Sequence, residues 1–293
     1  MPDVSTLPTL IVQKIIGSAA EPLINSLVTW RDALPLLAVC RSWRIISKPI
    51  IYAKVFIEGN EMRGVSERFK HQSQVLDRAI NTNIDLVAFT DNSQLVRHIA
   101  VEFKAFSCLQ ALVGSKTIEN YLRAKDWSGV NSLSVKLAAN YISYGISSDS
   151  IDSFTVSTKD FCDTLFKSAN GITDLVVDIR STLQPCVAFG EALIQTYLDQ
   201  LKSFKCSAEM LSNITVIPDQ VSKLTIEFGS EHLIPVPKVN ATSLVQLEIL
   251  SAPDNFELAM LVDFEGKQAV EFCNLASLKI NYKNSFYDEQ TFR

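Results

Sequence analysis

The sequence is poor in the residues that build metal sites. It has only three histidines, His71, His98 and His232, and its six cysteines include no Cys-x-x-Cys pair. The two closest cysteines are 20 residues apart, whereas zinc sites draw on cysteines and histidines spaced by about two to four residues. The sequence therefore argues against a zinc cluster. Scattered cysteines without a disulfide framework are typical of a reducing compartment.

Glycine is also scarce, with ten residues in the whole chain. No two glycines are two or four positions apart, which excludes Gly-x-Gly nucleotide loops and the Gly-x-Ser-x-Gly turn of serine hydrolases. Gly59 and Gly64 have the spacing of a phosphate loop, but Val65 stands where the lysine is needed. We therefore predict no catalytic residue and no cofactor, with His98 a structural residue in a strand. A pocket joining a histidine to two carboxylates would instead favour a hydrolase or transferase.

Long hydrophobic runs are absent. The longest uncharged apolar runs have about seven residues, and a helix needs about 20 to cross a bilayer. No basic residue precedes Lys14, so the N-terminus does not resemble a signal peptide. The net charge of −5 disfavours nucleic acid, whose binding needs a basic surface. We predict a cytoplasmic or nuclear protein that binds neither membrane nor nucleic acid.

The charge is uneven along the chain. Residues 1–57 contain six Lys or Arg and three acids, a net charge of +3, which leaves −8 for the rest. An acidic partner would therefore suit the N-terminal segment better than the remainder.

Two amphipathic helices are predicted in this segment. In residues 5–20, Ser5 or Thr6 provides a cap, and apolar residues recur at intervals of three and four. A second helix is expected from Asp32, a good N-cap, to about Ser47, with Pro49 ending it.

The second helix would carry one apolar stripe. Leu36, Val39, Cys40 and Trp43 are spaced as i, i+3, i+4 and i+7, so they would share one face, with Cys40 buried as a small apolar residue. A helical segment of about 50 residues has little core of its own, so this face needs a partner. The partner is either another protein or the first strand that follows.

An internal repeat begins after this segment. The pattern apolar-x-x-apolar-x-apolar starts at Val96, Val130, Ile151, Ile172, Leu201, Val221, Leu244 and Leu275, and "YAKVFI" from Tyr52 fits as a first copy. The second and third apolar positions of each copy are two apart and face one side of a short strand. Stacked copies would form a parallel sheet with a shared core.

The intervals between copies have helical character in four places, 108–124, 159–170, 189–200 and 263–273. We therefore predict an α/β fold, a small N-terminal helical domain (1–57) followed by an irregular leucine-rich-repeat-like solenoid with a curved parallel sheet (58–293). Residues 58–93 are predicted to be a connecting helical segment. No Asn or Cys recurs at the turns, so an ordinary α/β domain remains the alternative.

The N-terminal segment resembles the F-box family. "LPTLIVQKII" matches the Leu-Pro start and the apolar helix of that pattern, and "LPLLAVCRSW" matches its Val-Cys-x-x-Trp helix. Leu10 stands where the family often has an acid, and the spacer between the helices is about nine residues longer. The longer spacer is similar to a divergent fungal type that precedes leucine-rich-like repeats.

The resemblance implies a non-enzymatic substrate-receptor subunit of an SCF-type cullin–RING ubiquitin ligase. The F-box would bind an acidic Skp-family adaptor and so join the cullin complex, while the repeats bind an unknown protein substrate. The residues implied to contact the adaptor are Leu7, Pro8, Ile11, Ile15, Leu34, Leu36, Val39, Cys40 and Trp43. The alternative is a repeat scaffold without a ligase role, whose N-terminal helices only cap the solenoid.

Overall fold

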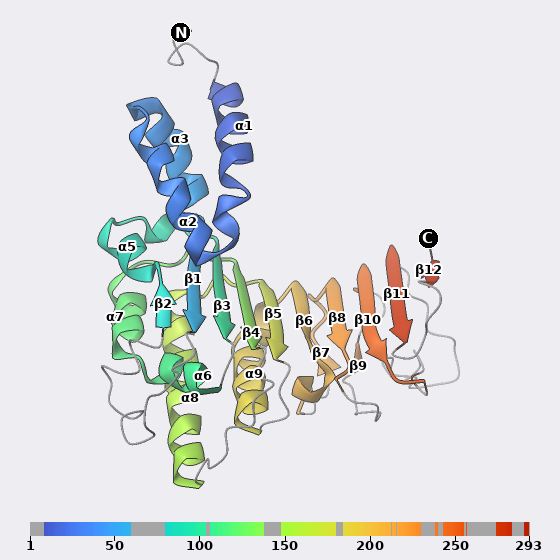
Figure 1. The fold of residues 1–293 in the computed structure, drawn as a ribbon. Coiled ribbons are helices and arrows are strands. Elements are labelled where there is room, and N and C mark those ends of the chain that lie inside the picture. The colour runs from blue at the N-terminus through green and yellow to red at the C-terminus, as the bar shows by residue number, and fades with distance from the viewer. Residues whose placement is uncertain are drawn as a thin grey trace.

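The fold was analysed in a computed structural model of the chain. It describes residues 9–59, 80–103, 106–137, 148–179, 184–211, 213–214, 216–229, 238–239, 243–254, 256, 274–282 and 290–292. This part of the chain forms an α/β structure in which an N-terminal group of helices precedes a mostly parallel sheet (Figure 1).

The main sheet has ten described strands, in the order β2-β1-β3-β4-β5-β6-β8-β10-β11-β12. The strands β1 to β11 of this sheet run parallel, and the edge strands β2 and β12 are antiparallel. Their bounds are β1 Lys54–Gly59, β2 Ile80–Thr82, β3 His98–Phe103, β4 Ser132–Leu137, β5 Asp174–Ile179, β6 Ser203–Ser207, β8 Lys223–Glu227, β10 Gln246–Ala252, β11 Ser277–Tyr282 and β12 Gln290–Phe292. Apart from β2, successive strands along the chain are neighbours in this sheet.

The sequence repeat predicts the eight parallel strands of this sheet, and one of its copies is not a strand. Each matching strand begins two residues after the first apolar position of its copy, as at Val96 before β3 and Val130 before β4. The copy from Ile151 was wrong, because it lies in the long helix α8, Ser148–Ser168. There Phe154 is buried and Val156 is exposed, as expected when residues two apart point to different sides of a helix.

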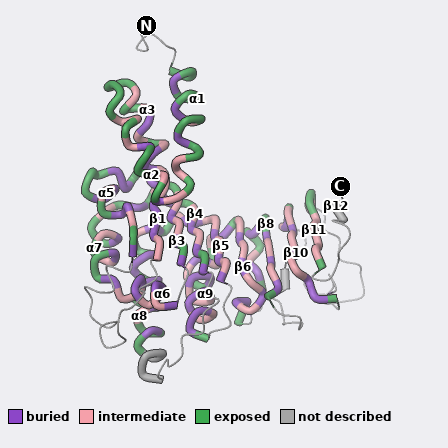
Figure 2. Tube along the Cα trace, in the orientation of Figure 1, coloured by how far each residue is buried: buried purple, intermediate pink, exposed green. Residues whose placement is uncertain are grey.

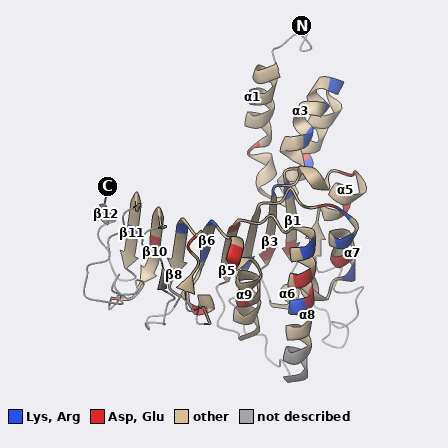
Figure 3. Cartoon of the chain, turned by 180° about the vertical axis from the view of Figure 1, so that it is seen from behind, with Lys and Arg blue, Asp and Glu red and all other residues tan. Residues whose placement is uncertain are grey.

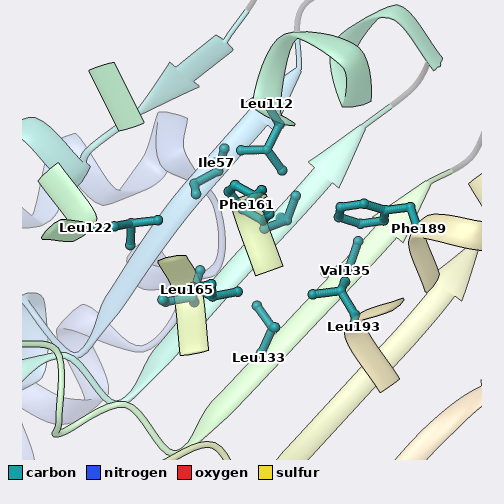
Figure 4. A pocket seen from close by; sticks show the side chains of 11 residues that line it. Ile57, Leu112, Leu122, Leu133, Val135, Phe161, Leu165, Phe189 and Leu193 are labelled. Atoms are coloured by element: carbon teal, nitrogen blue, oxygen red, sulfur yellow. The ribbon is translucent and has the colours of Figure 1, made fainter. Parts of the chain in front are cut away.

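The second and third apolar positions of each copy stack across the sheet. Ile99 of β3 pairs with Leu133 of β4, which pairs with Leu175 of β5, and all three are buried. This buried face packs on the helices α6, Phe106–Gly114, α7, Lys116–Ala124, α8, and α9, Gln184–Tyr197. The small apolar cavity in Figure 4 lies in this layer, between Leu133 and Val135 on the sheet and Phe161 on α8.

Backbone carbonyl groups connect the turns that enter successive strands. The carbonyl oxygen of Arg97 accepts hydrogen bonds from the amides of Asn131 and Ser132, at 3.0 and 3.1 Å. The carbonyl oxygen of Asn131 accepts from Thr173 and Asp174 in the same way. The pattern continues at Thr173, Lys202, Ser222 and Val245, and it begins with Ala53. Because these acceptors are backbone atoms, the turns need no recurring Asn or Cys.

The segments between strands are helical mainly in the first half. The expected helix 108–124 is two helices, since Ser115 separates α6 from α7 and caps the latter. The expected helices 159–170 and 189–200 fall in α8 and in α9 with the 3-10 turn η6, Leu198–Gln200, although residues 169–170 lie beyond the end of α8. The region 263–273 lies outside the described residues. Between β6 and β10, the described elements that connect the strands of the main sheet are η7, Ala208–Leu211, and a small parallel pair, β7 Val216–Ile217 and β9 Lys238–Val239.

The predicted boundary near residue 57 falls inside β1, which belongs to the main sheet. The region 58–93, expected to be helical, contains strand β2 as well as the helix α5, Ile84–Phe89, and the start of the turn η5, Ser93–Leu95. The buried core is continuous from Leu27, Trp30, Ala33 and Ile51 of the N-terminal segment into the sheet. Among the described helices, none combines the length and the apolar character that a bilayer-spanning segment requires.

Candidate interaction surface on the N-terminal helices

Five short helical elements precede the sheet in the part of the chain that the structure describes. They are α1 Thr9–Ala20, η2 Leu23–Asn25, α2 Leu27–Ala33, η3 Leu34–Ala38 and α3 Arg41–Ile51. Because α3 ends only two residues before β1, its first turn lies about 15 Å from the sheet, at 1.5 Å per helical residue. The helices α1 and α3 contact each other and project together beyond the sheet (Figure 1).

The prediction of a single helix over 32–47 was wrong, because the structure has α2, η3 and α3 over residues 27–51 instead. Helix α2 begins earlier because the Ser26 hydroxyl accepts a hydrogen bond from the amide of Thr29. The chain then breaks at Cys40, whose backbone is extended (φ −162°, ψ 173°) and whose Sγ accepts from the Trp43 amide at 3.5 Å. Pro49 lies inside α3 instead of ending it.

This break separates the residues of the predicted stripe. Leu36 belongs to η3, Val39 and Cys40 form the connection, and Trp43 lies in α3, so they do not share one helical face. Cys40 is exposed, which corrects the expectation that it is buried. Trp43 is half-buried, and its indole Nε1 is buried without a hydrogen-bond partner.

The other predicted adaptor residues divide into three groups. Ile11 and Ile15 are exposed on α1, at 46% and 43%. Leu34 and Leu36 are partly buried and pack against the core. Leu7 and Pro8 lie outside the described residues.

Helix α1 is apolar on two sides. Val12, Ile16 and Ala20 are buried, while Leu10, Ile11 and Ile15 are exposed. Six of the twelve large apolar side chains exposed in the described residues lie between positions 10 and 45. We call five of these, from α1 and the α3 region, the N-terminal apolar surface: Leu10, Ile11, Ile15, Val39 and Ile45. Figure 2 shows the exposed stretches of both projecting helices in green.

Helix α3 also carries a basic groove that the sequence analysis missed. It is shallow and open to solvent, and it is lined by Cys40, Arg41, Arg44, Ile45 and Lys48. The four α3 residues are spaced as i, i+3, i+4 and i+7, so they share one helical face. Figure 3 shows the basic residues of α3 in blue. The sequence signal for this groove is the helical spacing of its three basic residues, which overlap the stretch that carries the predicted apolar stripe.

The N-terminal helices are fixed to the sheet by buried and half-buried contacts. The indole Nε1 of Trp30 donates to the carbonyl oxygen of Ile51 at 2.7 Å, and the Trp30 ring packs edge-on against Tyr52. The amide of Leu27 donates to Oε1 of Glu58 on β1 at 2.9 Å. Helix α2 and the end of α3 are therefore part of the core that includes the sheet, and α1 contacts α3.

Comparison with known proteins gave no match. No family model, curated protein or solved structure matches this chain significantly. The function must therefore be argued from the chain's own residues.

His98 is the described residue most relevant to an enzymatic alternative. It lies in β3, as expected, on the face opposite the helices, with Nδ1 2.9 Å from the Ser132 hydroxyl and Nε2 3.1 Å from the Ser134 hydroxyl. Burial, with the charges of Lys54 and Lys136, lowers the pKa of His98 to about 4. Its hydrogen-bond partners are serines, and no group of three or more metal-ligating side chains occurs in the described part of the chain.

The sheet face that carries His98 is polar, and some of its charged side chains pair with each other. Lys205 pairs with Glu227 and Lys279 pairs with Glu248, each at 3.5 Å. The side chains on this face of β3 to β6 are half-buried or exposed, including Ser132, Asp174 and Ser203. This face therefore presents hydrogen-bonding groups over several adjacent strands.

Proposed function

We propose that this chain is the substrate-receptor subunit of an SCF-type ubiquitin ligase and that it is not itself an enzyme. Helices α1 and α3 bind a Skp-family adaptor, and the repeat region binds a protein substrate. The observation that carries the proposal is the N-terminal apolar surface, borne by helices that project from the sheet. Apolar side chains concentrated on so small a part of a chain favour an interface with another protein.

Three features of the N-terminal segment support this adaptor role. Ile11, Ile15 and Val39, which the F-box resemblance assigns to adaptor contact, are exposed. The segment is basic, at +3 for residues 1–57, which suits the acidic partner that the resemblance implies. Its attachment through Trp30 and Leu27 holds the projecting helices in a defined position.

The strand arrangement supports the receptor role of the remainder. The parallel strands of the main sheet lie side by side in chain order, and each begins two residues after an apolar residue. This arrangement is typical of leucine-rich-repeat-like solenoids. In such arrays the polar sheet face serves as a binding surface. The Ser, Asp and Lys side chains of β4 to β6 are the substrate-binding candidates.

A second candidate is a protein-binding scaffold without a ligase role. The observation that favours it is the burial of Leu27, Trp30 and Ala33 in the same core as β1. This burial is what a capping segment provides at the end of a repeat array. A cap alone, however, gives no reason for the apolar side chains exposed on the far side of α1.

Affinity purification of the full chain followed by mass spectrometry tests the proposal. We expect a Skp-family adaptor and a cullin to be recovered together. Recovery of other proteins without either component would favour the scaffold.

A further inference from the structure

We infer that the basic groove of α3 binds an acidic segment of the partner that carries an aliphatic side chain. This inference rests on the proposed function, because it names the chemistry of the partner at the same helical segment. It assigns a role to residues that are not among the adaptor contacts implied by the F-box resemblance, Arg41, Arg44, Ile45 and Lys48.

The charge of the groove is not neutralised by the rest of the described chain. Arg41 and Arg44 are exposed and Lys48 is half-buried, and none of them forms an ion pair with an acid in the described residues. Within the described residues, the Arg44 side chain donates a hydrogen bond from Nε to the carbonyl oxygen of Leu37, at 3.0 Å. This contact orients the guanidinium group and leaves its terminal nitrogens for another acceptor.

The groove also has an apolar element. Ile45 lies between the basic side chains and is 63% exposed, and the exposed Cys40 stands at one end of the groove. Three cations around an isoleucine match a segment that alternates carboxylates with an aliphatic residue. A wholly polar anion would leave Ile45 uncovered.

Charge complementarity indicates whether the groove binds a second copy of this chain or an acidic segment of another protein. A second copy of this chain is disfavoured, since the charge of −8 that it carries outside residues 1–57 is spread over 236 residues, and two acids of its sheet, Glu227 and Glu248, are already paired with lysines. An acidic segment places carboxylates directly against Arg41, Arg44 and Lys48, and opposite charges facing each other accelerate association and fix orientation.

The test is titration of the full chain with a purified Skp-family adaptor at low and high salt. The variant Arg41→Glu/Lys48→Gln reverses one charge and removes another, and Glu in the first helical turn is compatible with α3. We expect its affinity to fall about tenfold at low salt and the salt dependence to weaken. Ile45→Ala should lower the affinity at both salt concentrations.

The matched control is Lys159→Glu/Lys167→Gln, which makes the same change in net charge at two exposed residues of α8, away from the N-terminal helices. We expect less than a threefold loss for it. An equal loss in both double variants would overturn the groove assignment, because the net charge of the whole chain would then account for the binding. Thermal unfolding of each variant confirms that the fold is retained.

The result separates the two proposals. If the adaptor binds and the groove variants bind equally well, the groove inference fails and the proposed function stands. If the adaptor does not bind, the proposed function fails. The groove is then tested with a synthetic Glu-Asp-Leu repeat peptide against a Lys-Leu peptide of equal length, and equal affinity for both would overturn it.

Discussion

The indole nitrogen of Trp30 donates a hydrogen bond of 2.7 Å to the carbonyl oxygen of Ile51, the last residue of α3. Carbonyl groups in the last turn of a helix have no partner within the helix, so Trp30 satisfies a buried acceptor. The contact also joins α2 to the point where α3 turns into the sheet. It therefore fixes the direction in which the N-terminal helices project.

Trp30→Phe is expected to lower the free energy of unfolding by about 1–3 kcal/mol, because it leaves a buried carbonyl unsatisfied. Trp43→Phe is the control, since the Nε1 of Trp43 has no partner to lose. Denaturant unfolding of both variants measures the difference. Equal losses would contradict the role given to the Trp30 hydrogen bond.

Gly59 and Gly17 differ in the space around them, so replacing each by alanine should change the stability in opposite directions. A Cβ at Gly59 would lie 2.5 Å from Cys108 Cβ and 2.6 Å from Phe103 Cδ1, whereas one at Gly17 would meet nothing within 4 Å. We expect Gly59→Ala to destabilise the protein by about 1–3 kcal/mol through overpacking. Gly17→Ala on α1 should stabilise it by up to about 1 kcal/mol, because alanine has the better helix propensity. A shift of both melting temperatures in the same direction would argue against this packing.

The environment of His98 predicts a stability that depends on pH. Burial, Lys54 on β1 and Lys136 on β4 lower its pKa from 6.5 to about 4, and Glu102 is the nearby acid that acts on Lys54. The folded protein therefore holds the neutral imidazole, while the unfolded chain binds a proton below pH 6.5. The contribution of the neutral His98 to the free energy of unfolding is therefore complete above pH 6.5 and is lost as the pH falls toward 4.

The loss attributable to His98 is up to about 3 kcal/mol over this range. The measurement is the free energy of unfolding of the wild type and of His98→Gln at several pH values between 7 and 4. We expect the difference between the two proteins to shrink as the pH falls. A difference independent of pH would show that His98 titrates normally in the folded state.

The strands were predictable from the sequence because their determinant is local. Two apolar residues two positions apart, preceded by a third, mark each parallel strand from β1 to β11 of the main sheet. The copy at Ile151 shows the limit of this signal. A helix also buries residues three apart, so the pattern alone does not distinguish the two structures, and only the exposure of Val156 does.

The break at Cys40 was not predictable in the same way. Residues 32–47 have the apolar spacing of one helix, but α2 begins at Leu27 and packs Trp30 on the chain at Ile51. This long-range contact determines where the chain must turn, and no local pattern encodes it. As a result, the predicted stripe is divided, while Ile11, Ile15 and Val39 are exposed as an adaptor contact requires. Whether they meet the adaptor stays a prediction.

The central claim is that the N-terminal apolar surface binds a Skp-family adaptor. Its most direct test is the dissociation constant for a purified adaptor, measured for the full chain and for Ile11→Asp/Val39→Asp. Both side chains are exposed, at 46% and 55%, so the substitutions should leave the fold intact. The control is Phe89→Asp, whose side chain is 86% exposed on α5. We expect at least a hundredfold weaker binding for the double variant, since burying an unpaired charge in an interface costs several kcal/mol, and no change for the control. Equal affinity of the double variant and the wild type would contradict the claim.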